Sequence, residues 1–182
     1  MVETSWCSGT RQESSPGSAM AISYIQVNDS NLNTWHQKLY DFGNTLEIQQ
    51  RCNASAIASG GLQFSYPSME AIRLFSQLAT NDQAMIVIAQ DTGAIHGYLI
   101  CTDDRGGKYG GCYARWIGIK PNPPPASADI YSRMGDVAVA KFGWLWGKVT
   151  NNAIRSLMLA QIDDCELGIP GQSEIVTYKK PA

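Results

Sequence analysis

The sequence predicts a single α/β (α+β) domain with about six strands and three helices. Two observations support this: short apolar or alternating runs typical of strands recur along the chain, and between them apolar residues follow helical spacing. The 182 residues suffice for one core of ordinary size. Hydrophobic residues make up 44% of the chain and charged residues 16%, which is not the composition of a disordered protein.

The N-terminal part contains a polar leader, a strand and a helix. Residues 1–20 are rich in Ser and Gly without periodicity, so we expect a disordered leader or tag before a single domain over 21–182. Residues 22–27 alternate as a strand does. Apolar side chains then recur at helical spacing over 32–46, after several asparagines that are good helix caps.

The middle of the chain predicts a second helix and a three-stranded meander. Two glycines and a proline interrupt the first helical pattern, and Ser68 is a suitable start for a helix through Leu78. Three apolar runs, separated by a turn and a glycine-rich loop, then predict strands over 83–90, 94–102 and 112–119.

A proline-rich stretch separates the meander from the C-terminal part. Apolar residues at helical spacing from Met134 to Val149 predict the third helix, and runs over 154–162 and 173–182 predict two last strands. Trp144 and Trp146 would then point about 200° apart on this helix. We therefore expect one of them to be exposed or to contact a partner, as in a homodimer or a complex with another protein.

Charge and cysteine content limit the function classes. The net charge of −2 without a basic block argues against a large nucleic-acid surface, and no apolar run approaches the roughly 18 residues that span a membrane. Five widely spaced cysteines do not suggest a disulfide framework or a zinc site. Cys101 and Cys112 fit small core residues, and a reducing, cytoplasmic compartment is expected.

The order of elements resembles the GNAT superfamily of N-acetyltransferases from Ala21 to the end. The stretches MIVIAQDTGAIHGYLI, WIGIKP and VTYKKP are similar to its second and third, fourth and last strands. The resemblance implies a central mixed, mostly antiparallel sheet flanked by three helices. It also implies an N-acyltransferase that moves an acetyl or acyl group from acyl-CoA to a small-molecule or protein amine by direct attack.

In this family, a motif at the start of the third helix binds the pyrophosphate of coenzyme A through backbone N–H groups. The motif has Arg or Gln, two variable residues, Gly, one variable residue, then Gly or Ala. Its best match here contains Arg133, Met134, Gly135, Asp136 and Ala138, with Asp136 in place of the central glycine. A carboxylate about 4 Å from a phosphate charge would cost about 4 kcal/mol near a protein surface.

The resemblance further implies a slot for the pantetheine arm beside the strand over 112–119. Ile117 and Ile119 would line it, and a backbone N–H near Ile119 would face the thioester carbonyl. Gly118 would mark a bulge or a close backbone approach. The residues alone favour another interpretation, in which Gly118 makes room for Trp116 or a neighbouring helix.

No catalytic residue is identified from the sequence. His96 could face a central cleft or be structural, and His36 is expected in solvent. Glu70 fits a favourable charge at a helix start, and Asp103 and Asp104 fit turn formers.

Many family members place a tyrosine, as the general acid, on a helix after the fifth strand. With that strand over 154–162, the following residues 163–172 are too short for a full helix and contain no tyrosine. The alternative to an enzyme is therefore a catalytically inactive GNAT-fold binding or assembly protein.

Overall fold

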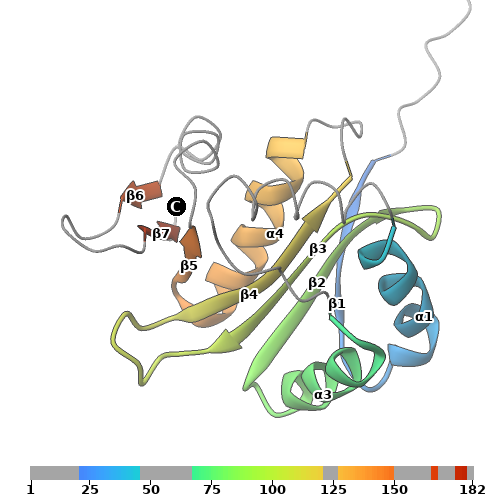
Figure 1. Ribbon diagram of the computed structural model, residues 1–182, viewed down its shortest axis with the longest axis horizontal. Coiled ribbons are helices and arrows are strands. Elements are labelled where there is room, and N and C mark those ends of the chain that lie inside the picture. The colour runs from blue at the N-terminus through green and yellow to red at the C-terminus, as the bar shows by residue number, and fades with distance from the viewer. Residues whose placement is uncertain (1–20, 46–66, 121–126, 150–164, 168–174, 180–182) are drawn as a thin grey trace, which may run out of the picture.

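The computed structural model describes residues 21–45, 67–120, 127–149, 165–167 and 175–179. In chain order the elements are β1 Ser23–Val27, α1 Leu32–Gly43, α3 Met69–Thr80, β2 Ala84–Asp91, β3 Ala94–Asp103, β4 Cys112–Ile119, α4 Ser127–Phe142, β5 Leu145–Val149, β6 Cys165–Leu167 and β7 Ile175–Lys179. The strands form one seven-stranded sheet in the order β1-β2-β3-β4-β5-β7-β6 (Figure 1). Neighbouring strands are antiparallel except β4 and β5, which are parallel.

This arrangement confirms the expected mixed, mostly antiparallel sheet flanked by helices. Three helices lie within the described ranges, as expected. Within the described residues the sheet has seven strands, whereas about six were expected. Two of the seven, β5 and β6, lie where no strand was predicted, and the strand predicted over 154–162 falls outside the described residues.

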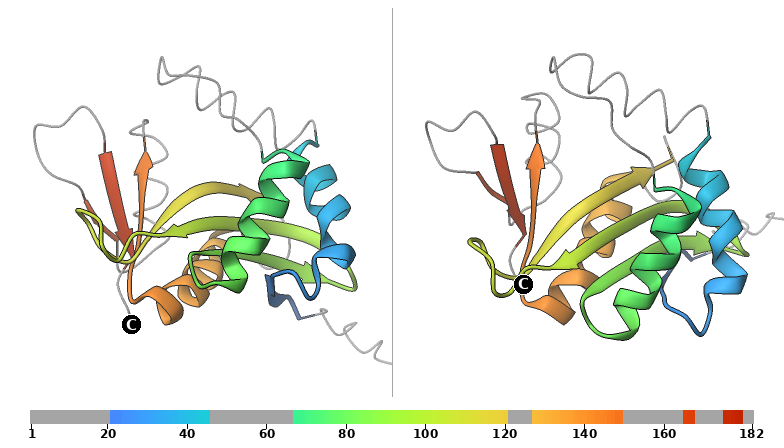
Figure 2. Two further views of the ribbon diagram at one scale, coloured as in Figure 1. Left: turned by 90° about the horizontal axis from the view of Figure 1, so that it is seen from below. Right: turned by 60° about the horizontal axis from the view of Figure 1, so that its bottom comes forward.

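The helices cover the two faces of the sheet separately (Figure 2). The core under α4 contains Met85, Val87, Leu99, Cys101, Cys112, Ile130, Met134, Ala138, Phe142 and Leu145. The core under α1 and α3 contains Val27, Trp35, Leu39, Ile72, Phe75, Ile86, Ile88, Tyr98 and Ile100. Cys101 and Cys112 are fully buried free thiols, which confirms them as small core residues.

Local sequence explains where α3 begins and how β2 connects to β3. Ser68 is the N-cap of α3, and its hydroxyl accepts a hydrogen bond from the backbone N–H of Ala71 at 3.1 Å. At the hairpin tip, Thr92 and Gly93 both have positive φ, as a tight hairpin turn requires. The predicted helix start at Ser68 and the predicted hairpin are therefore confirmed.

The third helix does not lie where the apolar spacing placed it. It was predicted from Met134 to Val149, whereas α4 spans Ser127–Phe142 and the chain then forms β5. Gly143 ends the helix with a left-handed φ of 79°. The error arises because Leu145 and Val149 continue the helical spacing, although in the structure they belong to a strand.

This shift corrects the expectation of a partner surface on the third helix. Trp144 and Trp146 follow the helix, so they do not lie on opposite sides of it. Trp146 belongs to β5 and is only 8% exposed, while Trp144 is half-buried. Neither tryptophan is an exposed helical residue, so the expected support for a dimer or a partner surface is absent. In the ranges that the structure describes, no helix has the length and apolar character to cross a membrane.

Candidate functional site

The parallel strands β4 and β5 separate soon after they meet. Their only paired residues in the described part of the chain are Cys112 with Leu145 and Tyr113 with Trp146. Beyond that point β4 continues beside β3 to Ile119, and β5 continues beside β7 to Val149 (Figure 2). The two strands thus form a V whose vertex lies at Tyr113 and Trp146.

The backbone of β4 presents polar groups to the open side of this V. The N–H of Lys120 donates to the carbonyl of His96 in β3 at 2.8 Å. Because N–H groups alternate in direction along a strand, those of Ile119 and Ile117 point to the β5 side. Both isoleucine side chains pack on the core under α4. Ile117 and Ile119 therefore border the separation between the strands.

The glycine in β4 serves close packing, and the bulge lies elsewhere. A Cβ at Gly118 would stand 2.4 Å from Cε1 of Tyr98, its cross-strand partner in β3. Gly118 therefore makes room for a neighbouring side chain, which is Tyr98 and not the expected Trp116. The register between β3 and β4 shifts between Ala114 and Trp116, so Arg115 is the extra residue.

The five residues matched to the cofactor motif lie in the interior of α4. Since the helix begins at Ser127, they occupy its second to fourth turns and not its start. Backbone N–H groups there donate to carbonyls four residues earlier, so they cannot bind phosphate. Met134 and Ala138 are fully buried in the core and Gly135 is also buried, whereas Asp136 is exposed.

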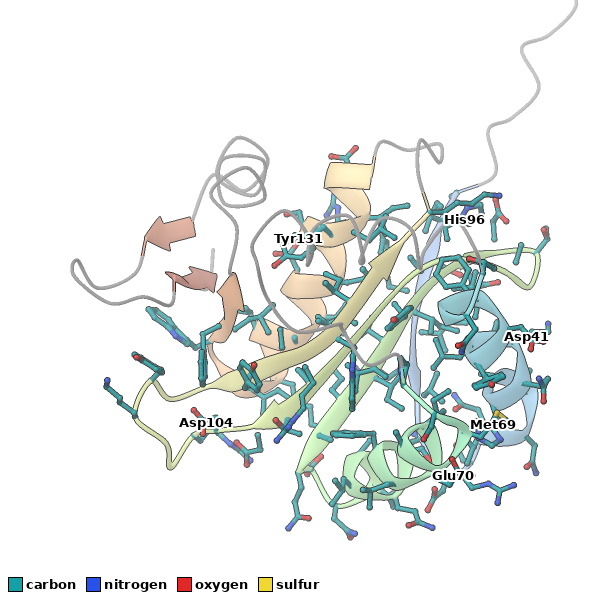
Figure 3. All side chains as sticks on the ribbon, in the orientation of Figure 1. Asp41, Met69, Glu70, His96, Asp104 and Tyr131 are labelled. Atoms are coloured by element: carbon teal, nitrogen blue, oxygen red, sulfur yellow. The ribbon has the colours of Figure 1, made fainter. Side chains whose placement is uncertain are left out.

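The charged residues of α4 gather on the side that faces β1. Burial raises the pKa of Tyr24 in β1, the positive charge of Arg133 opposes this, and Asp129 and Asp136 raise that pKa further. These three α4 residues therefore lie near β1, an edge strand that β2, β3 and β4 separate from β5. Tyr131 and Phe142 lie on the same stripe of α4. The Phe142 ring lies 5.4 Å from the guanidinium of Arg105, in the loop before β4. This stripe therefore faces β4 and β5 (Figure 3).

The chain before α4 contains few backbone donors. Four of the six residues from 121 to 126 are prolines, which carry no N–H. The first-turn N–H groups of α4 have no partner within the helix, and Asp129 places a negative charge beside them. Any phosphate at this helix start would depend on that one turn.

The two histidines make specific contacts away from the V. Nε2 of His96 lies 2.9 Å from Oδ1 of Asp91, in ion-pair contact rather than as a well-aligned hydrogen bond. Figure 3 places His96 at the opposite end of the sheet from Asp104. His36 is half-buried, and its Nε2 lies 2.8 Å from the carbonyl oxygen of Met69. The expectation that His36 faces solvent is wrong, because this contact joins α1 to α3.

The acidic candidates have local structural contacts. Glu70 lies in the first turn of α3, where hydrogen bonds from backbone and Ser68 lower its pKa. Asp103 binds Arg105 through both carboxylate oxygens, at 2.9 and 2.8 Å, and this hydrogen bonding lowers the pKa of Asp103. Asp104 accepts a hydrogen bond from the indole N–H of Trp146 at 3.1 Å. The expectation that Asp103 and Asp104 form the turn is confirmed, and Asp104 also contacts Trp146 at the vertex of the V.

A cluster of aromatic residues at the vertex was not predicted from the sequence. The ring centroid of Trp146 lies 4.5 Å from that of Tyr113 and 4.7 Å from that of Tyr109. The Arg115 guanidinium lies 5.7 Å from the centre of the Tyr113 ring. We call these four residues the vertex cluster. The alternation over residues 112–115 (CYAR) indicates that Tyr113 and Arg115 share a face. Trp146 could not be added to them, because its strand had been assigned to a helix.

Structures of acetyltransferases share this fold, although no family model and no curated protein matches the sequence. An N-acetyltransferase from Staphylococcus aureus Mu50 superposes with a TM-score of 0.57 at 9% identity, covering 88% of this chain and 97% of the other. The GNAT domain of S. lividans PAT gives 0.60 at 8% identity, covering 86% and 89%.

A third structure carries its ligands. Diaminobutyrate acetyltransferase EctA from Paenibacillus lautus, in complex with L-2,4-diaminobutyric acid and coenzyme A, has a TM-score of 0.54 at 12% identity, covering 89% of this chain and 96% of the other. At such identities the likeness concerns the fold, which agrees with the strand order and the V between β4 and β5. This chain has a divergent GNAT fold.

Proposed function

We propose that this protein is an N-acyltransferase that transfers an acetyl or other acyl group from acyl-CoA to an amine. The observation that carries the proposal is the separation of β4 from β5 beyond Tyr113 and Trp146. A narrow thioester arm lying between the separated strands would reach backbone groups of β4 that a continuous sheet would use for strand pairing. EctA, a structural neighbour crystallised with coenzyme A and an amine substrate, supports the same use of the fold.

In this proposal Ile117 and Ile119 line the slot for the pantetheine arm. The amine nitrogen attacks the acyl carbon and forms the C–N bond, the C–S bond breaks, and the thiolate leaves. The amine loses one proton and the thiolate gains one. The N–H of Ile117, directed to the β5 side, would donate to the oxyanion formed during attack, a contribution typically worth 10²–10³-fold in rate.

The phosphates of the acyl-CoA would bind at the start of α4. The first-turn N–H groups from Ser127 onward supply donors there. Arg133 supplies a positive charge, since side chains on a helix lean towards its N-terminus. Within the matched motif, Met134, Gly135 and Ala138 would shape the helix packing, and exposed Asp136 would not touch the phosphates.

Tyr131 is our candidate proton donor to the leaving thiolate. It lies on the stripe of α4 that faces β4 and β5, on the same side as Phe142. A phenol is a suitable acid for a thiolate leaving group. The fifth strand is β5, which ends at Val149 and not within 154–162. Residues 163–172 are therefore not the segment that directly follows the fifth strand, and residues 150–164 lie outside the described ranges.

A catalytically inactive GNAT-fold binding or assembly protein is the second candidate. Two observations favour it: four prolines within residues 121–126 remove N–H donors, and Asp129 places a negative charge at the helix start. Both weaken phosphate binding, and neither alters the slot between the strands.

Thermal unfolding with acetyl-CoA separates these two candidates. Ligand at 100 times its dissociation constant should add about 2.7 kcal/mol of stability, which raises Tm by roughly 5–10 °C for a domain of this size. Ile117→Trp should reduce this shift by filling the slot. Leu74→Trp, at a position 52% exposed on α3, is the matched control and should keep it. Absence of any shift at millimolar acetyl-CoA would favour the inactive binding protein.

A further inference from the structure

We infer that the vertex cluster binds the acceptor, and that this acceptor is an amine carrying a carboxylate and an aromatic or other planar body. The inference rests on the proposed function, since it takes the V as the place where the acyl group is transferred. The vertex cluster is Tyr109, Tyr113, Arg115 and Trp146, as defined above.

The vertex cluster lies on the sheet face opposite α4. Cys112 and Leu145 pack in the core under α4, so their neighbours Tyr113 and Trp146 point to the other face. An acyl group held in a gap of the sheet is accessible from two faces, and α4 lies on one of them. An acceptor on the opposite face could approach the acyl carbon without displacing a donor bound beside α4.

Arg115 points to the same face as Tyr113. A bulge lets two successive side chains point the same way. Trp116 makes an edge contact with Phe75 of α3 at 5.2 Å, and the Arg115 guanidinium lies over the Tyr113 ring. Arg115 is two residues after Tyr113 and so shares its face by alternation, while the bulge turns Trp116 to that face as well. Alternation along β4 thus places a positive charge beside the aromatic rings.

Among the residues that the structure describes, Arg115 has no acidic partner, unlike the nearby Arg105. Arg105 is held by both carboxylate oxygens of Asp103. Arg115 is exposed, and its Nε donates to the hydroxyl of Thr102 at 3.4 Å. None of the ion pairs formed by the described residues includes Arg115. A planar guanidinium with its fork available is suited to a carboxylate, which it binds through two parallel hydrogen bonds.

The aromatic rings beside Arg115 are fixed. Trp146 is 8% exposed between Tyr109 and Tyr113, and Asp104 holds its indole N–H. Tyr113 is half-buried and so offers one edge of this stack to a ligand. Rigid aromatic surface beside an available cation favours a planar, anionic ligand over an aliphatic or cationic one.

The spacing along β4 connects this cluster to the reacting atoms. Arg115 and Ile117 are two residues apart, at most about 7 Å along a strand. An acceptor whose carboxylate binds Arg115 can therefore place an amine a few bonds away near the thioester carbonyl at Ile117. The chemistry is the step given above, with the amine nitrogen as nucleophile and the thiolate as leaving group.

Two matched pairs of amines test this inference: L-phenylalanine against 2-phenylethylamine, and 4-(aminomethyl)benzoate against benzylamine. Each pair differs only in its carboxylate. Calorimetry on the full chain with saturating acetyl-CoA should show that at least one acid binds tenfold or more tightly than its partner. Acetylation of that acid, followed by release of the CoA thiol, should show the same preference. Equal affinity within both pairs, or no binding of any member, overturns the inference.

Arg115→Gln should abolish the carboxylate preference and leave the thermal shift with acetyl-CoA unchanged. Arg105→Gln, on the neighbouring loop, is the matched control and should retain the preference. A loss of the acetyl-CoA shift in Arg115→Gln would overturn the inference, because Arg115 would then bind the donor. Absence of that shift in the unaltered protein defeats the proposed function and this inference with it. A normal shift without carboxylate preference defeats this inference alone.

Discussion

The two halves of the candidate acyl-CoA site differ in what they depend on. The strand half needs only that β4 and β5 pair at Tyr113 and Trp146 and then separate. The helix half needs backbone N–H donors before and at the start of α4, where four of the six preceding residues are prolines. A slot made by strand pairing survives wide sequence change, whereas a phosphate site made of N–H groups is lost when those groups are removed.

The largest expected effect tests whether the matched motif is core or cofactor site. Met134→Ala removes a fully buried side chain and should cost about 2–5 kcal/mol of unfolding free energy. Asp136→Ala, two residues away and exposed, should change it by no more than about 0.5 kcal/mol. Urea unfolding of both variants measures the difference. Similar values for the two would contradict the placement of these residues on α4.

A second substitution tests the strand half. Gly118→Ala brings a Cβ to 2.4 Å from the Tyr98 ring and should destabilise the protein by about 1–3 kcal/mol. Gly106→Ala meets no atom within 4 Å and is the matched control. Equal unfolding temperatures of the two variants in a thermal scan would contradict the close packing of Tyr98 against Gly118.

A smaller effect is expected at Asp136. In the motif register, Asp136→Gly should strengthen acetyl-CoA binding by removing a repulsive charge. At an exposed position inside α4, it should leave the dissociation constant unchanged and cost up to about 1 kcal/mol of stability through the helix propensity of glycine. Calorimetry with acetyl-CoA decides between these outcomes, and tighter binding would restore the motif register.

The smallest effect concerns the ion pair of Arg105 with Asp103, for which Arg115 has no counterpart among the described residues. Hydrogen bonding from Arg105 lowers the pKa of Asp103 below its usual value of 3.8. A carboxylate with a lowered folded-state pKa stabilises the protein above its unfolded-state pKa and loses this contribution as pH falls through the folded value. At pH 7 the free energy of unfolding of the unaltered protein should exceed that of Asp103→Asn by a few tenths of a kcal/mol. That gap should vanish near pH 2, and a gap independent of pH would contradict the ion pair.

Several elements could be predicted because their signals are local. The apolar run over 112–119, bounded by glycines and a proline, matches β4 residue for residue. Ser68 was recognised as a cap because a side-chain oxygen at that position satisfies a helical N–H. In contrast, the end of α4 depended on the conformation of Gly143, and helical spacing alone did not reveal it.

The sequence by itself determined the mixed α/β class, the meander of β2, β3 and β4, the buried cysteines and the scarcity of N–H donors before α4. Those properties follow from residue types and short periodicities, which act over a few residues. Only the tertiary structure decided that Arg115 and Trp146, 31 positions apart, share one face at the vertex of a V. The parallel pairing of β4 with β5 sets that juxtaposition, and this pairing depends on which distant strands meet.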